Sequence, residues 1–188
     1  IAQLATAHSA LGDAQAAFAN LDTAQRMANR LGFRREEAED LTLIGDVFGE
    51  AGDDRHALDY YARALAATDS LEAPEERGNI LRSVARAHAH LGNARLAMQR
   101  ALDALDMHRR GGFRSAELDD RLLLAELAQV MNASDQSTAH LRAAKVLARS
   151  MRTDMATARV ALTEAEVALG AGAPRDALRA LDGARESL

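Results

Sequence analysis

The chain has 188 residues, of which 48% are hydrophobic, 27% are charged and 3% are aromatic. Alanine alone contributes 43 residues, whereas 12 glycines and 2 prolines are too few for a disordered linker or for the turns of an all-β protein. The net charge of −5 argues against a nucleic-acid binder, which carries a basic surplus. We therefore expect a mostly helical protein that does not bind nucleic acid directly.

The sequence also limits the cellular context. It contains no uncharged apolar run of about 18 residues, which a membrane span needs, and no apolar N-terminal segment of the signal-peptide type. Cysteine is absent, which excludes disulfides and thiolate metal sites. We expect a cytoplasmic location, and the abundance of arginine over the single Lys145 suggests a bacterial source. Because the chain opens at Ile1 within an expected helix, we expect a fragment of a longer protein.

In chain order, the first feature is a helix–turn–helix corner that recurs with a period of about 40 residues. Gly12, Gly52 and Gly92 mark the first three corners, and Asn132 and Gly172 occupy the same place in the last two. Glycine and asparagine tolerate the left-handed backbone that closes a helix. Five corners predict ten helices of roughly 15–18 residues. The breaks are expected near residues 12, 32, 52, 72, 92, 112, 132–135, 152 and 172.

Small residues recur at two places in each unit and let neighbouring helices approach to about 8–10 Å. Five residues after the corner stand Ala17, Ala57, Ala97 and Ala177, and seven residues further stand Ala24, Ala64, Ala104 and Ala184. In the fourth unit Ala139 fits this pattern better than Ser137. The sequence therefore predicts a two-residue insertion within residues 132–135.

The turns between units carry their own signals. Gly32-Phe33-Arg34 recurs as Gly112-Phe113-Arg114, two repeats further along the chain. Pro74 is followed by two glutamates and predicts a helix start, since acidic side chains favour the positive end of the helix dipole. Pro174 likewise opens the last expected helix.

These residues resemble the tetratricopeptide repeat, whose pattern is nearly complete in Leu41, Ile44, Gly45, Phe48, Gly52, Asp53, Ala57, Tyr61 and Ala64. The usual repeat has about 34 residues, and longer units are similar to those of bacterial signalling regulators and kinesin-light-chain scaffolds. The resemblance implies an all-α, right-handed α-solenoid of antiparallel helix pairs, with about five repeats. It would form a single domain over residues 1–188, with units of approximately 1–32, 33–72, 73–112, 113–152 and 153–188.

In this family, the first helix of each pair projects its binding residues into a concave groove. Carried over to this sequence, the resemblance assigns the candidate peptide-binding residues to Thr42, Asp46, Glu50, Arg82, Arg86, His90, Glu126, Gln129 and Glu166. Further polar residues at such positions are Thr6, Ser9, Glu39, Asn79, Asp119 and Arg159. The family's clamp for a C-terminal Glu-Glu-Val-Asp peptide uses lysine and asparagine there, and this sequence lacks that set.

Two interpretations of this groove remain open. Arg82 and Arg86 lie one helical turn apart, so both guanidinium groups can face one carboxylate or phosphate of a ligand. Alternatively, Arg86 forms intramolecular salt bridges with Asp46 and Glu126 on flanking helices.

No catalytic or metal-binding motif accompanies the repeats. The sequence has no nucleophile elbow, Walker lysine, dinucleotide-binding glycine pattern or His-Glu-x-x-His motif. His8 and His88 occupy the repeat position of Phe48, so packing explains them better than metal ligation. We expect no enzyme activity, no cofactor and no metal.

Two further segments could take part in binding. The basic stretch from His108 to Arg114 is interpreted as a solvated corner between units rather than as a nucleic-acid patch. The last helix keeps an apolar stripe of Ala177, Leu178, Leu181 and Leu188, where a repeat array normally ends in a polar cap. We therefore expect a homodimer or further repeats to cover the helix at residues 175–188.

The function that these features favour is a non-enzymatic scaffold that holds a protein or peptide segment in the concave groove. The alternatives are a ligand- or peptide-sensing domain of a larger bacterial transcriptional or signalling regulator, and the recognition arm of a multidomain enzyme.

Overall fold

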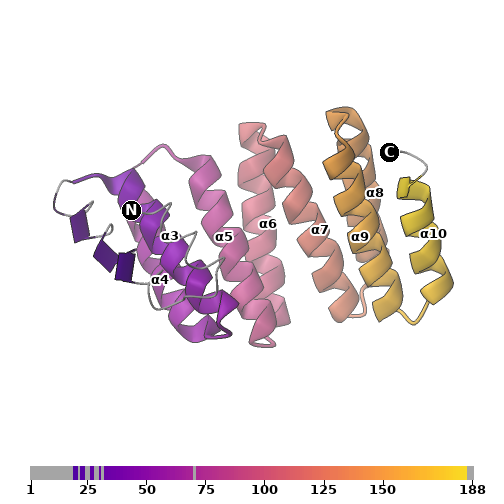
Figure 1. Ribbon diagram of the computed structural model, residues 1–188, viewed down its shortest axis with the longest axis horizontal. Helices are drawn as coiled ribbons and strands as arrows, with labels where there is room; N and C mark the ends of the chain where they lie inside the picture. The colour runs from indigo at the N-terminus through magenta and orange to yellow at the C-terminus, as the bar shows by residue number, and fades with distance from the viewer. Residues whose placement is uncertain are drawn as a thin grey trace. The chain divides into compact units, whose positions relative to one another are not determined.

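The computed structural model describes residues 19–20, 22–23, 26–27, 30, 32–69 and 71–185. These residues contain eight long helices and no strand, so the expected all-α fold is confirmed over them. The two helices expected before residue 32 fall almost wholly outside the described residues, which leaves eight helices rather than ten. They are α3 (Arg34–Glu50), α4 (Asp54–Thr68), α5 (Pro74–His90), α6 (Ala94–Gly111), α7 (Arg114–Val130), α8 (Ser134–Met151), α9 (Asp154–Gly170) and α10 (Pro174–Arg185) (Figure 1).

The helices break where the sequence predicted, because the corner residues adopt left-handed backbone. Gly52, Gly92 and Gly172 have φ of 81°, 76° and 72°, and Asn132 has φ of 57°. At the first of these corners the amide of Asp53 donates to the Phe48 carbonyl at 2.8 Å, and that of Gly52 to the Gly49 carbonyl at 3.0 Å. The same pair of bonds recurs at the other three corners and satisfies the last carbonyls of each helix.

The predicted insertion at residues 132–135 is wrong. The corner at Asn132 has the same length and bonds as the others, and α8 begins at Ser134. Ser137 is buried at the place of Ala57, whereas Ala139 is exposed. The hydroxyl of Ser137 donates to the Ala125 carbonyl at 2.8 Å, which satisfies the one polar atom that distinguishes it from alanine. A serine therefore fits the small-residue position without a change of register.

The chain divides into two compact units, residues 1–93 and 94–188, each with its own packing. In the first unit α4 packs against α3 and α5. Its buried cluster contains Leu41, Tyr61, Ile80 and Val84, with Ala57 and Ala64 fully buried between the larger side chains. The alanines let the helix axes come close enough for the leucine, isoleucine and valine side chains to fill the space between them.

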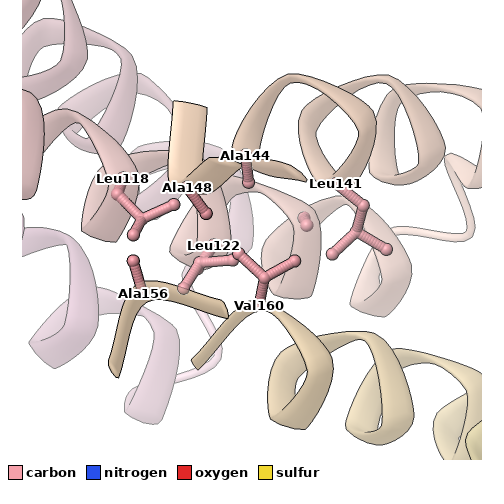
Figure 2. Close-up of a cluster of buried hydrophobic side chains, with 8 residues drawn as sticks. Leu118, Leu122, Leu141, Ala144, Ala148, Ala156 and Val160 are labelled. Atoms are coloured by element: carbon pink, nitrogen blue, oxygen red, sulfur yellow. The ribbon is translucent and has the colours of Figure 1, made fainter. Parts of the chain in front are cut away.

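In the second unit α7 packs against α6, α8 and α9, and α9 packs against α8 and α10. Figure 2 shows its buried cluster, in which Leu118 and Leu122 of α7 meet Ala156 and Val160 of α9. Ala144 and Ala148 of α8 close the cluster. Within each unit a helix buries its apolar face against its neighbours, as expected for stacked repeats.

The basic stretch at residues 108–114 is only partly a solvated corner. Arg109 and Arg110 are exposed and pair with Asp106 one turn earlier. His108, in contrast, is fully buried, and its Nδ1 lies 2.5 Å from Oδ2 of the fully buried Asp120. This contact joins α6 to α7, so the histidine belongs to the core and not to the surface.

Over the described residues, no helix combines the length and apolar character that crossing a bilayer requires.

Candidate binding wall of the first helices

The nine candidate residues named above are called the first-helix wall. All nine lie on α3, α5, α7 and α9, each the first helix of its pair. Within the first unit α3 contacts α5, and within the second unit α7 contacts α9. Thr42, Asp46, Glu50, Arg82, Arg86 and His90 belong to the first unit, and Glu126, Gln129 and Glu166 belong to the second. Thr6 and Ser9 lie outside the described residues.

Asp46 is held by internal hydrogen bonds. Its Oδ1 accepts from the hydroxyl of Tyr61 at 2.7 Å and from the hydroxyl of Ser83 at 3.3 Å, so it links α3 to both α4 and α5. Burial raises the pKa of Asp46, and the negative charge of Glu50 adds to this, while the two hydroxyl donors act in the opposite direction. Burial also raises the pKa of Tyr61, so the phenol stays protonated as the donor.

Arg86 takes no direct part in this network. Its side chain is exposed and makes no ion pair or hydrogen bond with the described part of the chain. Its charge helps to lower the pKa of Asp46 at longer range, but the predicted salt bridge between the two does not form. The hydroxyl groups of Tyr61 and Ser83 take the place of that salt bridge. Glu126, the other predicted partner, lies in the second unit.

Arg82 is half-buried beside Asn79, one turn earlier on α5. Its Nη2 donates to Oδ1 of Asn79 at 2.7 Å, which helps to orient the guanidinium along the helix. Arg86 follows one turn later and is exposed. The two arginines thus stand on neighbouring turns of α5, one oriented by its neighbour and the other open to solvent.

The remaining wall residues of the first unit differ in their internal hydrogen bonds and in their exposure. Nδ1 of His90 lies 3.1 Å from Oδ1 of Asp54, the first residue of α4, and the His90 side chain is 62% exposed. The hydroxyl of Thr42 donates to the Ala38 carbonyl at 2.7 Å, so its proton is already used in a hydrogen bond within α3. Glu50 is exposed at the end of α3. His90 and Glu50 therefore keep surface that a ligand could contact.

In the second unit, part of the surface beside the wall is neutralised internally. Arg159 of α9 forms an ion pair with Asp119 of α7, and both are among the additional groove positions expected from the sequence. Glu126 and Gln129 are half-buried on α7, and Glu166 is exposed on α9. The wall residues of the second unit include no arginine, and the two arginines of the wall both lie on α5.

Sequence reasoning missed three residues that shape this wall, namely Tyr61, Ser83 and Asp54. Tyr61 was assigned to packing by the repeat pattern, and nothing in the spacing indicates that its hydroxyl reaches Asp46. Ser83 is a small residue in a helix that carries several other polar groups. Asp54, which is only 7% exposed, shows no sequence signal apart from its place at a helix start.

The structure places no cluster of three or more His, Cys, Asp or Glu side chains suited to a metal among the described residues. Within each unit, the wall residues are separate polar and charged groups of a kind that forms hydrogen bonds and ion pairs.

Comparison with known proteins agrees with this geometry. Residues 1–70 match the family model of the tetratricopeptide repeat, which is the family that the sequence resembles. No curated protein matches the chain.

Several solved structures share the fold. A putative kinesin light chain from Podosopora anserina with nearly identical TPR-like repeats has a TM-score of 0.79 at 14% identity, covering 98% of this chain and 91% of that one. A Rap protein complexed with competence and sporulation factor has a TM-score of 0.83 at 14% identity, covering 98% of this chain and 52% of that one. A signal transduction ATPase with a tetratricopeptide repeat sensor from Pyrococcus horikoshii has a TM-score of 0.70 at 18% identity, covering 87% of this chain and 26% of that one.

Proposed function

We propose that this chain is a non-enzymatic scaffold that binds a protein or peptide segment along the first-helix wall. The observation that supports it most is the exposed Arg86 on α5, which has no ion pair among the described residues. Arg82 stands one turn before it and is oriented by Asn79. Two guanidinium groups on neighbouring turns suit a carboxylate or phosphate of the partner.

The proposal includes an architecture. The two units would form one continuous array of about five repeats over residues 1–188, wound as a right-handed superhelix. The first helices would line its concave side, so that α3, α5, α7 and α9 contribute to one groove. Support comes from the repeat period, from the matching corners in both units and from the packing of first helices against each other within each unit.

Similar proteins support a role in recognition. The Rap protein with this fold was solved in complex with competence and sporulation factor, and the Pyrococcus horikoshii ATPase uses its repeats as a sensor. Both are longer than this chain. These examples also favour the second candidate function, a sensing domain of a larger bacterial regulator. The recognition arm of a multidomain enzyme is a related alternative, in which the repeats would again bind the partner of a larger protein. In each case the location would be the cytoplasm.

The test uses peptides selected from a random library for binding to the 188-residue chain. In the double variant Arg82→Ala, Arg86→Ala we expect their affinity to fall by about tenfold or more, because the neighbouring guanidinium groups are lost. Circular dichroism should show unchanged helicity, since neither arginine belongs to the buried clusters. If both the affinity and the helicity were unchanged, the two arginines of α5 would not belong to the binding site.

A matched control comes from two arginines of equal charge outside the wall. Arg109→Ala with Arg110→Ala removes two exposed guanidinium groups from the last turn of α6, where both pair with Asp106. We expect this variant to bind the selected peptides as the unmodified chain does. An equal loss of affinity in both double variants would indicate attraction by overall charge and would contradict the proposal.

The last helix pair provides a proposed association surface. Leu178 and Leu181 of α10 are 63% and 44% exposed, whereas Leu141, at the repeat position of Leu181, is only 8% exposed. We expect a homodimer or further repeats to cover this face. Sedimentation velocity over a range of concentrations should show a dimer that Leu178→Glu dissociates, and a monomer at every concentration would exclude the dimer.

A further inference from the structure

A second surface lies where α7 packs along α8. It is a groove of about 570 Å³, which we name the Arg114 groove. Arg114 and Arg121 of α7 and Arg142 of α8 line it, and Ala143, Val146 and Leu147 of α8 form its apolar floor. All these residues belong to the second unit.

The groove is separate from the wall residues of α7 because of helix geometry. Glu117 of α7 lines the groove, and Glu126 of α7 belongs to the wall. Nine residues correspond to two and a half turns at 3.6 residues per turn, so these two glutamates point in opposite directions from the helix axis. A ligand bound in the groove therefore does not occupy the wall side of α7.

The charge of the groove is positive and only partly compensated. Arg121 donates to Oε1 of Glu117 from Nε at 2.9 Å and from Nη2 at 2.6 Å, so this arginine has its own carboxylate. Arg114 donates to the hydroxyl of Ser150, which is neutral. The side chain of Arg142 is exposed and has no ion pair or hydrogen bond within the described ranges. Among the described residues, Arg114 and Arg142 thus have no carboxylate partner.

The floor of the groove is apolar and open to solvent. Val146 is 64% exposed, which is high for a valine in the middle of a packed helix. Ala143 lies about one turn before it on α8, and Leu147 is its neighbour in the chain. Covering such a surface removes apolar area from water, so it favours a partner with apolar side chains rather than a purely ionic one.

The neighbouring groove between α8, α9 and α10 lacks this combination. Lys145 there donates to Glu164 at 2.6 Å, and Arg179 pairs with Asp176. Each of these two cations is already matched with a carboxylate, which leaves Arg149 as the remaining cation of the lining. The Arg114 groove is the better match for a negatively charged ligand.

We propose that the Arg114 groove binds a short acidic peptide segment with alternating apolar side chains. The stretch of α8 from Ala139 to Ser150 spans 11 residue steps, or about 16 Å at 1.5 Å per residue. An extended peptide of about five residues covers that length. Its apolar side chains contact Val146 and Leu147, and its carboxylates pair with Arg114 and Arg142. The absence of aromatic residues from the lining favours a peptide over single-stranded nucleic acid, which binds by stacking.

The test uses three labelled octapeptides and fluorescence anisotropy with the 188-residue chain. They are (Leu-Glu)4, (Leu-Lys)4 with the charge reversed, and (Ser-Glu)4 without the apolar side chains. We expect (Leu-Glu)4 to bind most tightly and to weaken as salt is added, because exposed ion pairs are screened. Absence of (Leu-Glu)4 binding, or equal binding of all three peptides, would overturn the proposal, and so would a preference for (dT)12 over (Leu-Glu)4.

Two variants locate the binding. Arg114→Glu with Arg142→Glu should weaken (Leu-Glu)4 binding by about tenfold or more, because attraction becomes repulsion. Val146→Ser should weaken it by a few-fold without a change of charge. The charge-matched control is Arg55→Glu with Arg175→Glu, two exposed arginines that line neither groove, and it should bind as the unmodified chain does.

A comparison of two double variants separates binding in the Arg114 groove from binding at the first-helix wall. The variant Arg82→Ala, Arg86→Ala removes both arginines of the wall and leaves the Arg114 groove unaltered, so it shows which surface holds (Leu-Glu)4. If that variant loses the peptide while Arg114→Glu with Arg142→Glu keeps it, the acidic peptide binds to the wall and the groove proposal is wrong. Circular dichroism on every variant separates a loss of binding from a loss of fold.

Discussion

Asp40 of α3 and Asp120 of α7 occupy the same position in alternate repeats, yet their surroundings differ. Asp120 is fully buried and bonded to His108. Asp40 is 6% exposed, and its carboxyl has no hydrogen bond to any residue that the structure describes. Burial, together with the charges of Glu39 and Glu36, raises the pKa of Asp40 to about 6. A buried carboxylate that accepts no hydrogen bond from the described residues costs folding free energy when it is ionised.

The variant Asp40→Asn tests this cost. The folded-state pKa of Asp40 lies above the value of 3.8 for an unperturbed carboxyl, so the folded chain binds more protons between these values. Its stability therefore falls as the pH rises from about 4 to 6. We expect Asp40→Asn to raise the free energy of unfolding by about 2 kcal/mol at pH 7 and to leave it unchanged below pH 4. Urea unfolding at both pH values measures the difference.

Asp120→Asn is the matched comparison. The same change at the equivalent position removes the acceptor charge opposite His108, so we expect it to destabilise the chain by about 1–3 kcal/mol at pH 7. If both variants changed stability in the same direction, the local contacts would not explain the effect of Asp40.

Gly45 of α3 gives a second test at the scale of single residues. A Cβ at this position would clash with Cε1 of Tyr61, whose ring is held in the core and whose hydroxyl is bonded to Asp46. We expect Gly45→Ala to lower the free energy of unfolding by about 2 kcal/mol, since the ring has to move. Gly49→Ala in the same helix, with its nearest atom at 3.8 Å, should be neutral or stabilising. Thermal unfolding compares the two variants.

At the scale of helices, the turns that join one pair to the next use different residues for the same backbone. Gly32 and Gly112 have φ of 72° and 73°, and Arg152 at the equivalent position has φ of 56°. A left-handed conformation strains a residue that has a Cβ. The side chain of Arg152 is exposed and has no hydrogen bond or ion pair within the described ranges that would compensate for this strain.

Arg152→Gly should therefore stabilise the chain. We expect an increase of about 0.5–1 kcal/mol in the free energy of unfolding, because relief of strain outweighs the greater freedom of glycine in the unfolded chain. Gly112→Ala, which introduces a Cβ at the equivalent turn, should have the opposite sign. Chemical denaturation of the two variants gives the comparison, and a destabilised Arg152→Gly would contradict the account.

Helix boundaries followed from the sequence more closely than the register of small residues did. Pro74 and Pro174 begin α5 and α10, as predicted from their fixed φ. The error at Ser137 arose because the expected pattern allowed alanine alone. A serine is nearly as small, and its hydroxyl finds a carbonyl of the facing helix, which only the folded arrangement reveals.

For the whole molecule, the proposed superhelix makes a prediction about size. A compact globule of 188 residues has a radius of gyration of about 16 Å. We expect small-angle scattering of a monomeric sample to give a clearly larger value, because an open array of stacked pairs extends along its axis. A value at the globular figure would contradict a continuous five-repeat superhelix.

The two proposed binding surfaces differ in how far the sequence reveals them. The wall carries Arg82 and Arg86 on α5, and the sequence located it through the family resemblance. The Arg114 groove carries Arg114 and Arg142 beside an apolar floor. No sequence pattern indicates this groove, since these two arginines stand on different helices and their proximity depends on how α7 packs along α8.

For the described part of the chain, the helical class, the corners and the ends of the helices could be inferred from the order of residues. These features are local, because a left-handed glycine or a proline acts on the few residues next to it. The tertiary structure alone decided that Asp46 bonds to Tyr61 and Ser83 rather than to Arg86, and that His108 is buried against Asp120. Such contacts depend on the distance and rotation between neighbouring helices, which the combined packing of many side chains sets and which no single sequence spacing encodes.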